Sequence, residues 1–348
     1  MRYPLGLVLD SARHLASRKL RGDKKIPVMF SLDLMGGRVS PCGGANGNGN
    51  ATAGAQNGKM LSVEECLEAM DECHTPVVTI CGAEPLMHPD IARLTREILA
   101  RRKHLFLTTD GTRIRRHLHM IPPYTNFFWN VQLNGTQEAH EARAGRPGVF
   151  FEALDGVKAA KNAGFFVVVT STIFPDTDVT DLAALYNTLH AMHVDGYMLA
   201  PYYPSHKLCR NSAADFHENM RQRFREVGEH LSEYNLLVSP VYLEYLRGER
   251  ELDCCSWGNP VFGPQGWAEP CNQLNYGYEP SYKTMMDKTV WENFGRGINP
   301  RCEPCMSHAG YGTAAILGLN AKPGDLWKTL AWQLSGSLGE KRPRVRKP

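Results

Sequence analysis

The chain opens with apolar positions that repeat at helical spacing. Between residues 5 and 21 apolar side chains recur every three or four positions, and Arg13, Arg18 and Lys19 lie opposite them. This pattern is typical of an amphipathic helix with one face against another surface. We expect this helix either to cap the domain that follows or to make peripheral contact with anionic lipid at the inner face of the membrane.

After residue 25, short apolar segments alternate with longer segments of helical period. A first helix is predicted to follow a capping box formed by Ser62 and Glu65, and a second to begin at Pro89. Further helices are predicted at 112–119, 147–163 and 178–192. Strands are predicted at 28–34, 76–81, 104–109, 126–133, 164–173 and 195–200. Because parallel strands need long crossovers, the alternation predicts an α/β protein with a parallel sheet. Six units before residue 205 are too few for a closed eightfold barrel and favour a partial (β/α)6 barrel.

The rest of the pattern divides the chain into parts. Residues 36–59 are rich in Gly, Asn and Ala without periodicity, so we expect a flexible loop within the barrel. Because the loops after parallel strands open on one end, this loop should lie beside Gly82–Pro85. The parts are an N-terminal helix (1–24), the partial barrel (25–205), a helical connector (206–252), a small Cys-rich module (253–325), and a C-terminal helix with a basic tail (326–348).

Composition narrows the class of protein. With 348 residues, 43% of them hydrophobic, the chain can bury a substantial core, and a formal net charge of +3 argues against a nucleic-acid partner. We find no signal peptide and no apolar run that would span a bilayer, so we expect a cytoplasmic protein. In that compartment ten cysteines with a tight Cys-x2-Cys pair indicate reduced thiols or a metal site.

The turn after the second predicted strand is a candidate ligand site. It reads Cys81-Gly82-Ala83-Glu84-Pro85, in which two small residues let backbone carbonyls approach a ligand and Glu84 supplies charge for an amino group. The residues alone also allow an ordinary βα turn whose angle is set by Pro85.

The C-terminal module contains a second candidate. Cys254 and Cys255 are followed by Cys271 and by the pair Cys302 and Cys305. We expect Cys255, Cys271, Cys302 and Cys305 to complete a tetrahedral site for zinc or an auxiliary [4Fe–4S] cluster. The alternative is a set of buried free thiols. Cys66 and Cys73, seven residues apart on one helix face, are expected to act as small hydrophobes.

Nine stretches along nearly the whole chain resemble one enzyme family. They include the basic N-terminal helix, GAEPLMHPDI at 82–91, LTTDG at 107–111, VQLNG at 131–135 with His140, and CEPCMSHAGYG at 302–312. The others are LSVEECLEAMDECHTPVV at 61–78, VDGYMLAP at 194–201, CSWGNP at 255–260, and Trp267 with Cys271. In order and spacing the chain resembles the radical S-adenosylmethionine (SAM) enzymes, most closely the HpnH-type adenosylhopene-forming enzymes of hopanoid biosynthesis.

The resemblance implies a radical SAM-type barrel that holds a [4Fe–4S] cluster and SAM and adds a 5′-deoxyadenosyl radical to hopene. It implies that SAM would contact the loops after three strands, through Gly82, Ala83, Glu84, Pro85, Thr109, Asp110, Gln132 and Asn134. Several of these depart from the family pattern. Gly-Ala-Glu-Pro replaces Gly-Gly-Glu-Pro, Asp110 replaces Asn, and Gln132-Leu-Asn134-Gly replaces His-Leu-Asp-Gly. The Asp110 carboxylate would repel the carboxylate of SAM.

The largest departure concerns the cluster ligands. The family holds its cluster with Cys-x3-Cys-x2-Cys in the loop after the first strand, whereas this chain has Arg38, Cys42 and Ala45 at those positions. One thiolate, the remnant Cys42, cannot hold a site-differentiated cluster. We therefore expect a pseudoenzyme that binds a hydrophobic hopanoid-like ligand or an intact radical SAM paralogue. The alternative is an active adenosyl transferase with a rebuilt or partner-supplied cluster. We assign no catalytic side chain from the sequence.

Overall fold

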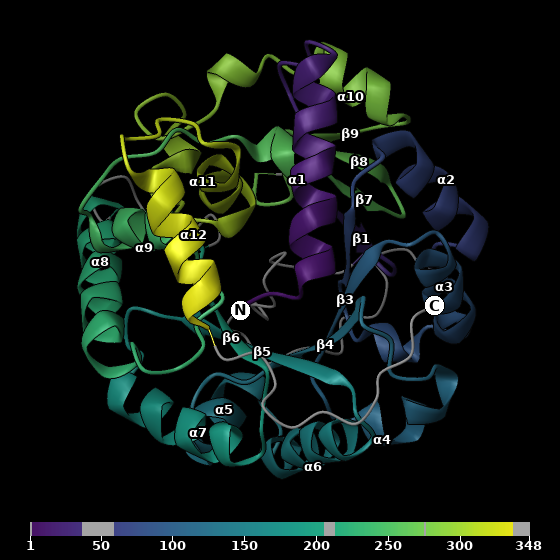
Figure 1. The fold of residues 1–348 in the computed structure, drawn as a ribbon, viewed down its shortest axis with the longest axis vertical. Helices are drawn as coiled ribbons and strands as arrows, with labels where there is room; N and C mark the ends of the chain where they lie inside the picture. Colours follow the sequence, from purple (N-terminus) through teal and green to yellow (C-terminus); the bar gives the residue numbers. More distant parts are fainter. Residues whose placement is uncertain (1, 37–58, 205–212, 275, 337–348) are drawn as a thin grey trace.

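The computed structural model describes residues 2–36, 59–204, 213–274 and 276–336 (Figure 1). The loop expected to be flexible, 36–59, lies almost wholly outside the described residues, as do Arg38, Cys42 and Ala45.

Six parallel strands form the centre of the molecule, each paired with the next along the chain. They are β1 (Met29–Asp33), β2 (Val77–Cys81), β3 (His104–Thr109), β4 (Phe127–Gln132), β5 (Phe166–Ile173) and β6 (Gly196–Pro201). All six were predicted from the apolar pattern, to within about two residues at each end. Every residue of β2, β3 and β5 is buried, as expected for parallel strands covered on both faces. The predicted parallel α/β fold is confirmed.

Helices connect these strands and cover the outside of the sheet (Figure 1). The predicted capping box begins α2, because Ser62 Oγ accepts from Glu65 N while the Glu65 carboxylate accepts from Ser62 N. Helix α4 is shorter than predicted, because a 3₁₀ turn at Leu118–Met120 replaces its second half. The helices are α2 (Val63–Cys73), α3 (Ile91–Ala100), α4 (Ile114–His117), α5 (Gln137–Ala144), α6 (Val149–Asn162), α7 (Val179–Ala191) and α8 (Ala213–His230).

Both edges of the six-stranded core are extended by segments that the sequence pattern did not reveal. At one edge β7 (Val261–Gly263) pairs in parallel with β1. At the other edge Leu236 forms a parallel bridge with Tyr197 of β6. The antiparallel strands β8 (Gly266–Glu269) and β9 (Gly277–Glu279) continue the sheet beyond β7. The Cys-rich part of the chain therefore builds directly onto the first barrel strand.

The C-terminal part consists of short elements packed around this extension. Its helices are α9 (Pro240–Arg247), α10 (Tyr282–Lys288), α11 (Thr313–Leu317) and α12 (Asp325–Ser335). Its single turns are 3₁₀ helices at Ser256–Gly258, Trp291–Asn293 and Pro300–Cys302, and a π-helix at His308–Gly312. Another 3₁₀ turn, Pro85–Met87, lies in the barrel after β2. None of the helices in the described part of the chain is both long enough and apolar enough to cross a bilayer.

The barrel interior has an apolar end and a polar end. Near the amino ends of the strands an apolar cluster that includes Val77, Phe106 and Phe166 packs against Tyr3 and against Leu7 of helix α1 (Leu5–Leu20). The polar end consists of hydrogen-bonded side chains inside the barrel: Thr170 Oγ1 donates to Asn130 Oδ1 (2.6 Å) and Asn130 Nδ2 donates to Thr108 Oγ1 (3.1 Å). Helix α1 therefore closes the amino end, and the polar carboxyl end remains for a ligand.

Candidate functional site

The first site loop begins where β1 and β2 end together. Asp33 and Cys81 are partners in the parallel ladder, so the loops that follow them leave the same end of the barrel, as predicted. Gly82 has φ +117°, and a Cβ there would lie 2.5 Å from Asp33 Oδ1. Only glycine fits this approach. The same Asp33 oxygen accepts the N–H groups of Met35 (3.3 Å) and Gly36 (3.0 Å), which turns the chain after β1.

Glu84 joins the loops after β2 and β3. Its carboxylate accepts from Thr109 Oγ1 (2.8 and 3.0 Å), from the Asp110 N–H (2.8 Å) and from the Leu86 N–H (3.0 Å). Burial of the carboxylate, followed by the nearby Asp110 charge, raises the pKa of Glu84 to about 8, although the hydrogen bonds oppose this rise. Glu84 was expected to supply charge to a ligand, and the structure shows that it also holds the two loops together.

The loop after β3 has its own internal order. Gly111 N donates to Thr109 Oγ1 (3.1 Å), while Asp110 Oδ1 accepts from both the N–H and the hydroxyl of Thr112 (2.9 and 2.8 Å). The Asp110 side chain thus lies at the exposed rim, and its carboxylate adds negative charge beside Glu84.

Gln132 and Asn134 connect the ends of β4 and β5. Gln132 Nε2 donates to Asn134 Oδ1 (2.7 Å) and to Thr172 Oγ1 (3.0 Å), and the Thr172 N–H donates to Asn134 Oδ1 (2.9 Å). Gln132 Oε1 is buried and has no hydrogen-bond partner among the described residues. Leaving a buried acceptor unpaired costs about 1–3 kcal/mol, so this oxygen suits a donor group of a ligand.

The structure therefore brings all eight expected cofactor-binding residues to the carboxyl ends of three neighbouring strands. They are Gly82, Ala83, Glu84 and Pro85 after β2, Thr109 and Asp110 at the end of β3, and Gln132 and Asn134 at the end of β4. Ligands of parallel α/β sheets bind at this end. Sequence reasoning missed Thr172, because its role depends on the register between β4 and β5. With the exposed Asp110 carboxylate and the unpaired Gln132 amide oxygen among the described residues, the rim suits a ligand with an amino group.

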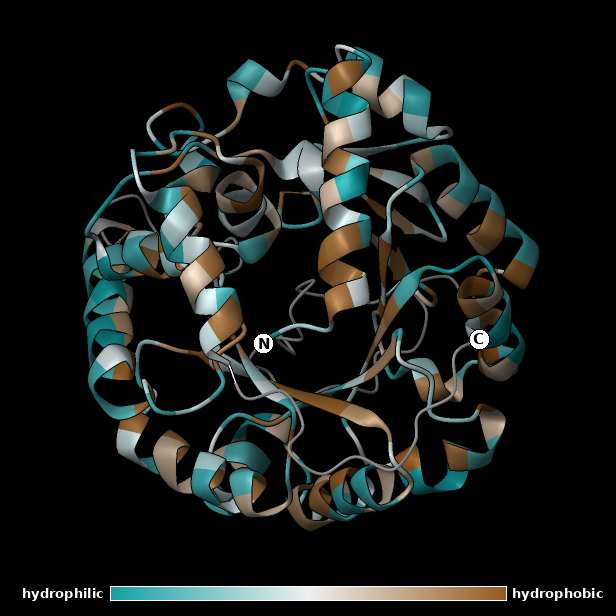
Figure 2. Cartoon of the chain, viewed as in Figure 1, coloured by the Kyte–Doolittle hydropathy of each residue, from teal (hydrophilic) through white to brown (hydrophobic). Residues whose placement is uncertain are grey.

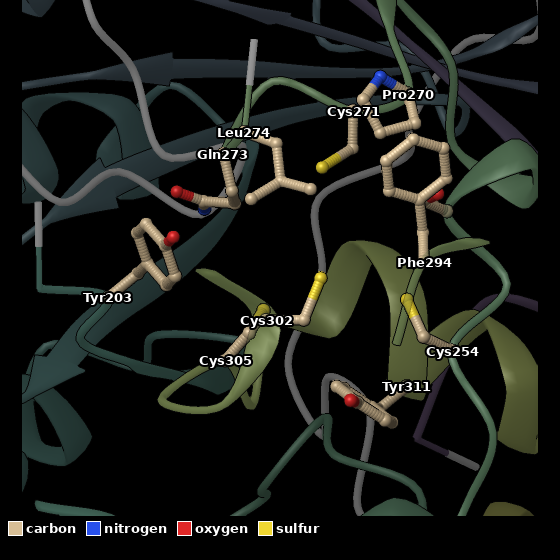
Figure 3. Close-up of a pocket in the computed structure, with 11 residues that line it drawn as sticks. Tyr203, Cys254, Pro270, Cys271, Gln273, Leu274, Phe294, Cys302, Cys305 and Tyr311 are labelled. Carbon is tan, nitrogen blue, oxygen red and sulfur yellow. The ribbon is translucent and has the colours of Figure 1, made fainter. Parts of the chain in front are cut away.

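The second candidate site is a cavity lined by four thiols of the C-terminal part. Figure 3 shows Cys254, Cys271, Cys302 and Cys305 around it, with Tyr203 and Tyr311 at its sides. Three of these cysteines belong to the set predicted from the sequence, and the fourth is Cys254 in place of Cys255. The Cys255 thiol instead donates to Gly310 O (3.3 Å) and packs in a separate apolar cluster with Ile26 and Val28. Two adjacent cysteines point in different directions, and the sequence alone did not distinguish them.

Backbone N–H groups are directed at three of the four sulfurs. Cys271 accepts from Gln273 and Leu274, Cys302 from Gly295, and Cys305 from Ser307, and each of these contacts lowers the pKa of its thiol. Burial has the larger effect and raises the pKa of Cys271 to about 11, and the pKa values of the other three also lie above the usual range. Without a cation, these buried thiols stay protonated at neutral pH.

The four thiols surround the cavity without converging on one point. A tetrahedral zinc site places its sulfurs about 3.8 Å apart. Within the described residues, no group of three or more His, Cys, Asp or Glu side chains is close enough to hold a metal ion. His308 does not line the cavity; its ring packs against Tyr242, and burial lowers its pKa to about 4.

The remaining cysteines have other positions. Cys66 and Cys73 are buried in the main apolar core, where burial raises the pKa of Cys66 to about 12. This is the packing role expected for them. Cys81 is buried at the end of β2, and Cys42 lies outside the described residues.

Fold and site together define a partial (β/α) barrel with its polar groups at the carboxyl ends of the strands. Two family models match the sequence. The radical SAM superfamily matches residues 47–189, and a domain of unknown function, DUF3463, matches residues 198–329.

Two individual proteins are similar to the chain at low identity. The antilisterial bacteriocin subtilosin biosynthesis protein AlbA of Bacillus subtilis is 23% identical over 300 residues, which cover 80% of this chain and 66% of AlbA. The AdoMet-dependent heme synthase of Methanosarcina barkeri is 22% identical over 252 residues, which cover 70% of this chain and 71% of the synthase. The chain thus spans just under two thirds of AlbA.

Among solved structures, SuiB of Streptococcus suis bound to its precursor peptide SuiA has a similar fold. The TM-score is 0.60 at 12% identity, and the match covers 85% of this chain and 74% of SuiB. SuiB bound to SAM matches with a TM-score of 0.52 at 12% identity over 73% of this chain and 62% of SuiB. Residues 47–189 are therefore similar to the radical SAM superfamily, and the solved structures have a similar fold.

Proposed function

We propose that this chain binds SAM at the carboxyl end of its barrel without cleaving it, and carries a cluster on its C-terminal thiols. The observation that carries the proposal is the contrast between two sets of residues. Hydrogen bonds join the loops after β2 and β3 and hold Asn134 against β5, whereas the chain has one cysteine where the family has three.

The barrel residues fit the amino-acid end of SAM. Gln132 Oε1 is a buried acceptor for which no partner is found among the described residues, and Asp110 supplies negative charge at the rim. A ligand ammonium group would find both a hydrogen bond and favourable charge there, and it would also favour the ionised form of the buried Glu84 carboxyl. Asp110 opposes the carboxylate of the same ligand. We therefore infer weaker SAM binding than an Asn at this position would give.

The loop between β1 and α2 does not fit a SAM-cleaving cluster. Such a cluster takes three thiolates and leaves one iron open for SAM, but the family spacing here gives Arg38, Cys42 and Ala45. Neither a guanidinium nor a methyl group ligates iron. We infer that this chain alone does not generate a 5′-deoxyadenosyl radical.

The C-terminal thiols fit an auxiliary [4Fe–4S] cluster better than zinc. Four cysteines from three segments line one cavity, backbone N–H groups are directed at three of the sulfurs, and the sulfurs are not gathered around a single point. Cluster sulfurs commonly accept such hydrogen bonds. When bound, the cluster would supply a covalent cross-link for these loops and one-electron redox capacity.

The ligand and partner are proposed from the sequence resemblance. The motifs resemble the adenosylhopene-forming family, so hopene is the first hydrophobic ligand to test, and an intact radical SAM paralogue is the first partner. None of the relatives named above is a hopanoid enzyme. An active adenosyl transferase whose cluster comes from a partner chain is the alternative.

Isothermal titration calorimetry with SAM tests the barrel part of the proposal. We expect the wild-type chain to bind SAM, and Gln132→Leu to weaken binding by about tenfold to a hundredfold, because the lost hydrogen bond to a charged donor contributes about 1.5–3 kcal/mol. Gln137→Leu, the same change at an exposed helical position, is the matched control and should bind like wild type. Absence of SAM binding by the wild type would contradict the proposal.

A further inference from the structure

Helix α12 has its polar and apolar sides reversed relative to an ordinary surface helix. Its two buried residues are polar, Asp325 and Gln333, while Trp327 is 75% exposed and Leu326 is 70% exposed. Leu330 and Leu334 are exposed as well. A surface helix normally buries its apolar side chains, so this orientation needs a physical cause.

Polar contacts at both ends hold α12 in this orientation. At its start the buried Arg250 guanidinium donates to Asp325 Oδ2 and to Asn320 O, both at 3.0 Å. At its end Gln333 Nε2 donates to Tyr3 O (2.9 Å), and Arg2 donates through Nε to Trp332 O (3.0 Å). These hydrogen bonds fix which side of the helix faces the protein, so the apolar side chains remain outside.

Helix α1 exposes apolar side chains in the same way. Its apolar stripe, expected to pack against the barrel if the helix were a cap, lies largely outside: Leu20 is 88% exposed, and Leu5 and Leu9 are exposed too. The barrel is closed instead by Tyr3 and Leu7. Positions 5, 9 and 20 share one side of a 3.6-residue helix, together with the exposed Ala12 and Ala16.

The two helices form one face. The rings of Tyr3 and Trp332 pack edge to face with their centroids 6.1 Å apart, and Arg2 N donates to Gln333 O. Figure 1 shows both helices on the viewed side, converging near the N-terminus, and Figure 2 shows hydrophobic residues along both. We call this the α1/α12 face and define it by its exposed large side chains, which are Leu5, Leu9, Leu20, Leu326, Trp327, Leu330 and Leu334.

The surroundings of this face are strongly basic. Residues 2–25 contain seven Lys or Arg and two Asp, a net charge of +5 against +3 for the whole chain. Both aspartates are paired, Asp10 with Arg13 and His104 and Asp23 with Arg18. A second copy of the chain on this face would bring two basic surfaces together, whereas an anionic bilayer matches both the charge and the apolar side chains.

We propose that the α1/α12 face docks the protein on an anionic bilayer surface, with Trp327 and the leucines in the interfacial region. Tyr3 and Leu7 place this face at the amino end of the barrel, away from the loops after β2, β3 and β4. The candidate SAM site therefore remains accessible when the protein is docked. This proposal is independent of the proposed function.

Vesicle co-flotation of the full chain tests it, on phosphatidylcholine vesicles with and without phosphatidylglycerol. We expect binding to the anionic vesicles only, and a loss of about a hundredfold in partition for Trp327→Ser/Leu330→Ser, because each inserted side chain contributes about tenfold or more. The matched control is Phe151→Ser, an exposed aromatic on α6, which should bind like wild type. An unchanged thermal melting curve shows that the double variant is folded.

Three results would overturn the proposal. One is no binding of wild type to the anionic vesicles. Another is equal binding by wild type and the double variant, since the face would then contribute nothing. The third is a wild-type chain that does not bind vesicles but forms a concentration-dependent dimer, with the dimer lost in the double variant. That result would assign the face to a second copy of the chain.

Discussion

The Thr109 hydroxyl lies within hydrogen-bond distance of both carboxylate oxygens of Glu84, at 2.8 and 3.0 Å. Thr109 is the last residue of β3, and Glu84 lies in the loop after β2, so this contact joins the two loops that carry most of the candidate SAM site. The position of Glu84 thus depends on a side chain from the neighbouring strand.

Thr109→Val should destabilise the protein, because the Glu84 carboxylate and Gly111 N–H both lose a partner. We expect a loss of about 1–3 kcal/mol in the free energy of unfolding, measured by urea denaturation. Thr188→Val removes a hydroxyl from the exposed side of α7 and should change stability by less than about 0.5 kcal/mol. Equal effects of the two variants would contradict a special role for Thr109.

Asp110→Asn should stabilise the protein at high pH and not at low pH. Burial and then the Asp110 charge raise the pKa of Glu84 from 4.5 to about 8. Because the folded-state pKa lies above the unfolded value, the contribution of Glu84 is most favourable below pH 4.5 and is lost as the pH rises through about 8. Removing the Asp110 charge reduces part of this loss.

The expected gain of Asp110→Asn at pH 8.5 is roughly 0.5–1 kcal/mol, since Asp110 is exposed and its charge is screened. Thermal melting of wild type and variant at pH 4.5 and pH 8.5 measures it. The same gain at both pH values would show that the effect does not come through the ionisation of Glu84.

Gly310→Ala should disturb the thiol cavity. A Cβ at Gly310 would lie 2.4 Å from Cys254 Sγ, so the sulfur must move. We expect the variant to bind less iron after anaerobic reconstitution, as measured by iron and sulfide analysis. Gly6→Ala is the control, because its Cβ would meet only His104 at 3.8 Å. Full iron content in Gly310→Ala would contradict the position of Cys254 as a ligand.

Adjacent cysteines give a sharper test of the ligand set. Cys254→Ser should lower cluster content, whereas Cys255→Ser should leave it unchanged and cost only the packing of a buried thiol. Iron-to-protein ratios of the two variants measure the difference. The opposite outcome would restore Cys255 to the set predicted from the sequence.

Much of the barrel could be predicted because its strands are buried on both faces. A run such as Val77–Cys81 is apolar except for Thr79, and the helices between the strands have clear periods and a capping box. The eight barrel site residues were named from the family resemblance, and they lie together because parallel strands place their carboxyl ends at one end of the barrel. Strands β7, β8 and β9 could not be predicted, because three or four residues with several glycines carry no usable periodicity.

Two features depended on orientation, which a sequence pattern does not contain. The choice between Cys254 and Cys255 is made by the Gly310 carbonyl, which accepts from the Cys255 thiol. The apolar side of α12 was recognisable, but a pattern identifies apolar positions and not the side that meets the protein. In α12 the side that faces the protein is set by the hydrogen bond from Arg250 to Asp325, two residues that lie 75 positions apart in the sequence.

The location of iron tests the central claim most directly. Anaerobically reconstituted Cys42→Ser and Cys305→Ser are compared with wild type by iron and sulfide analysis, electron paramagnetic resonance, and 5′-deoxyadenosine formation from SAM with dithionite. We predict one cluster in wild type and in Cys42→Ser, none in Cys305→Ser, and no 5′-deoxyadenosine from any of the three. Loss of a cluster and of 5′-deoxyadenosine formation in Cys42→Ser would contradict the account and identify an active radical SAM enzyme.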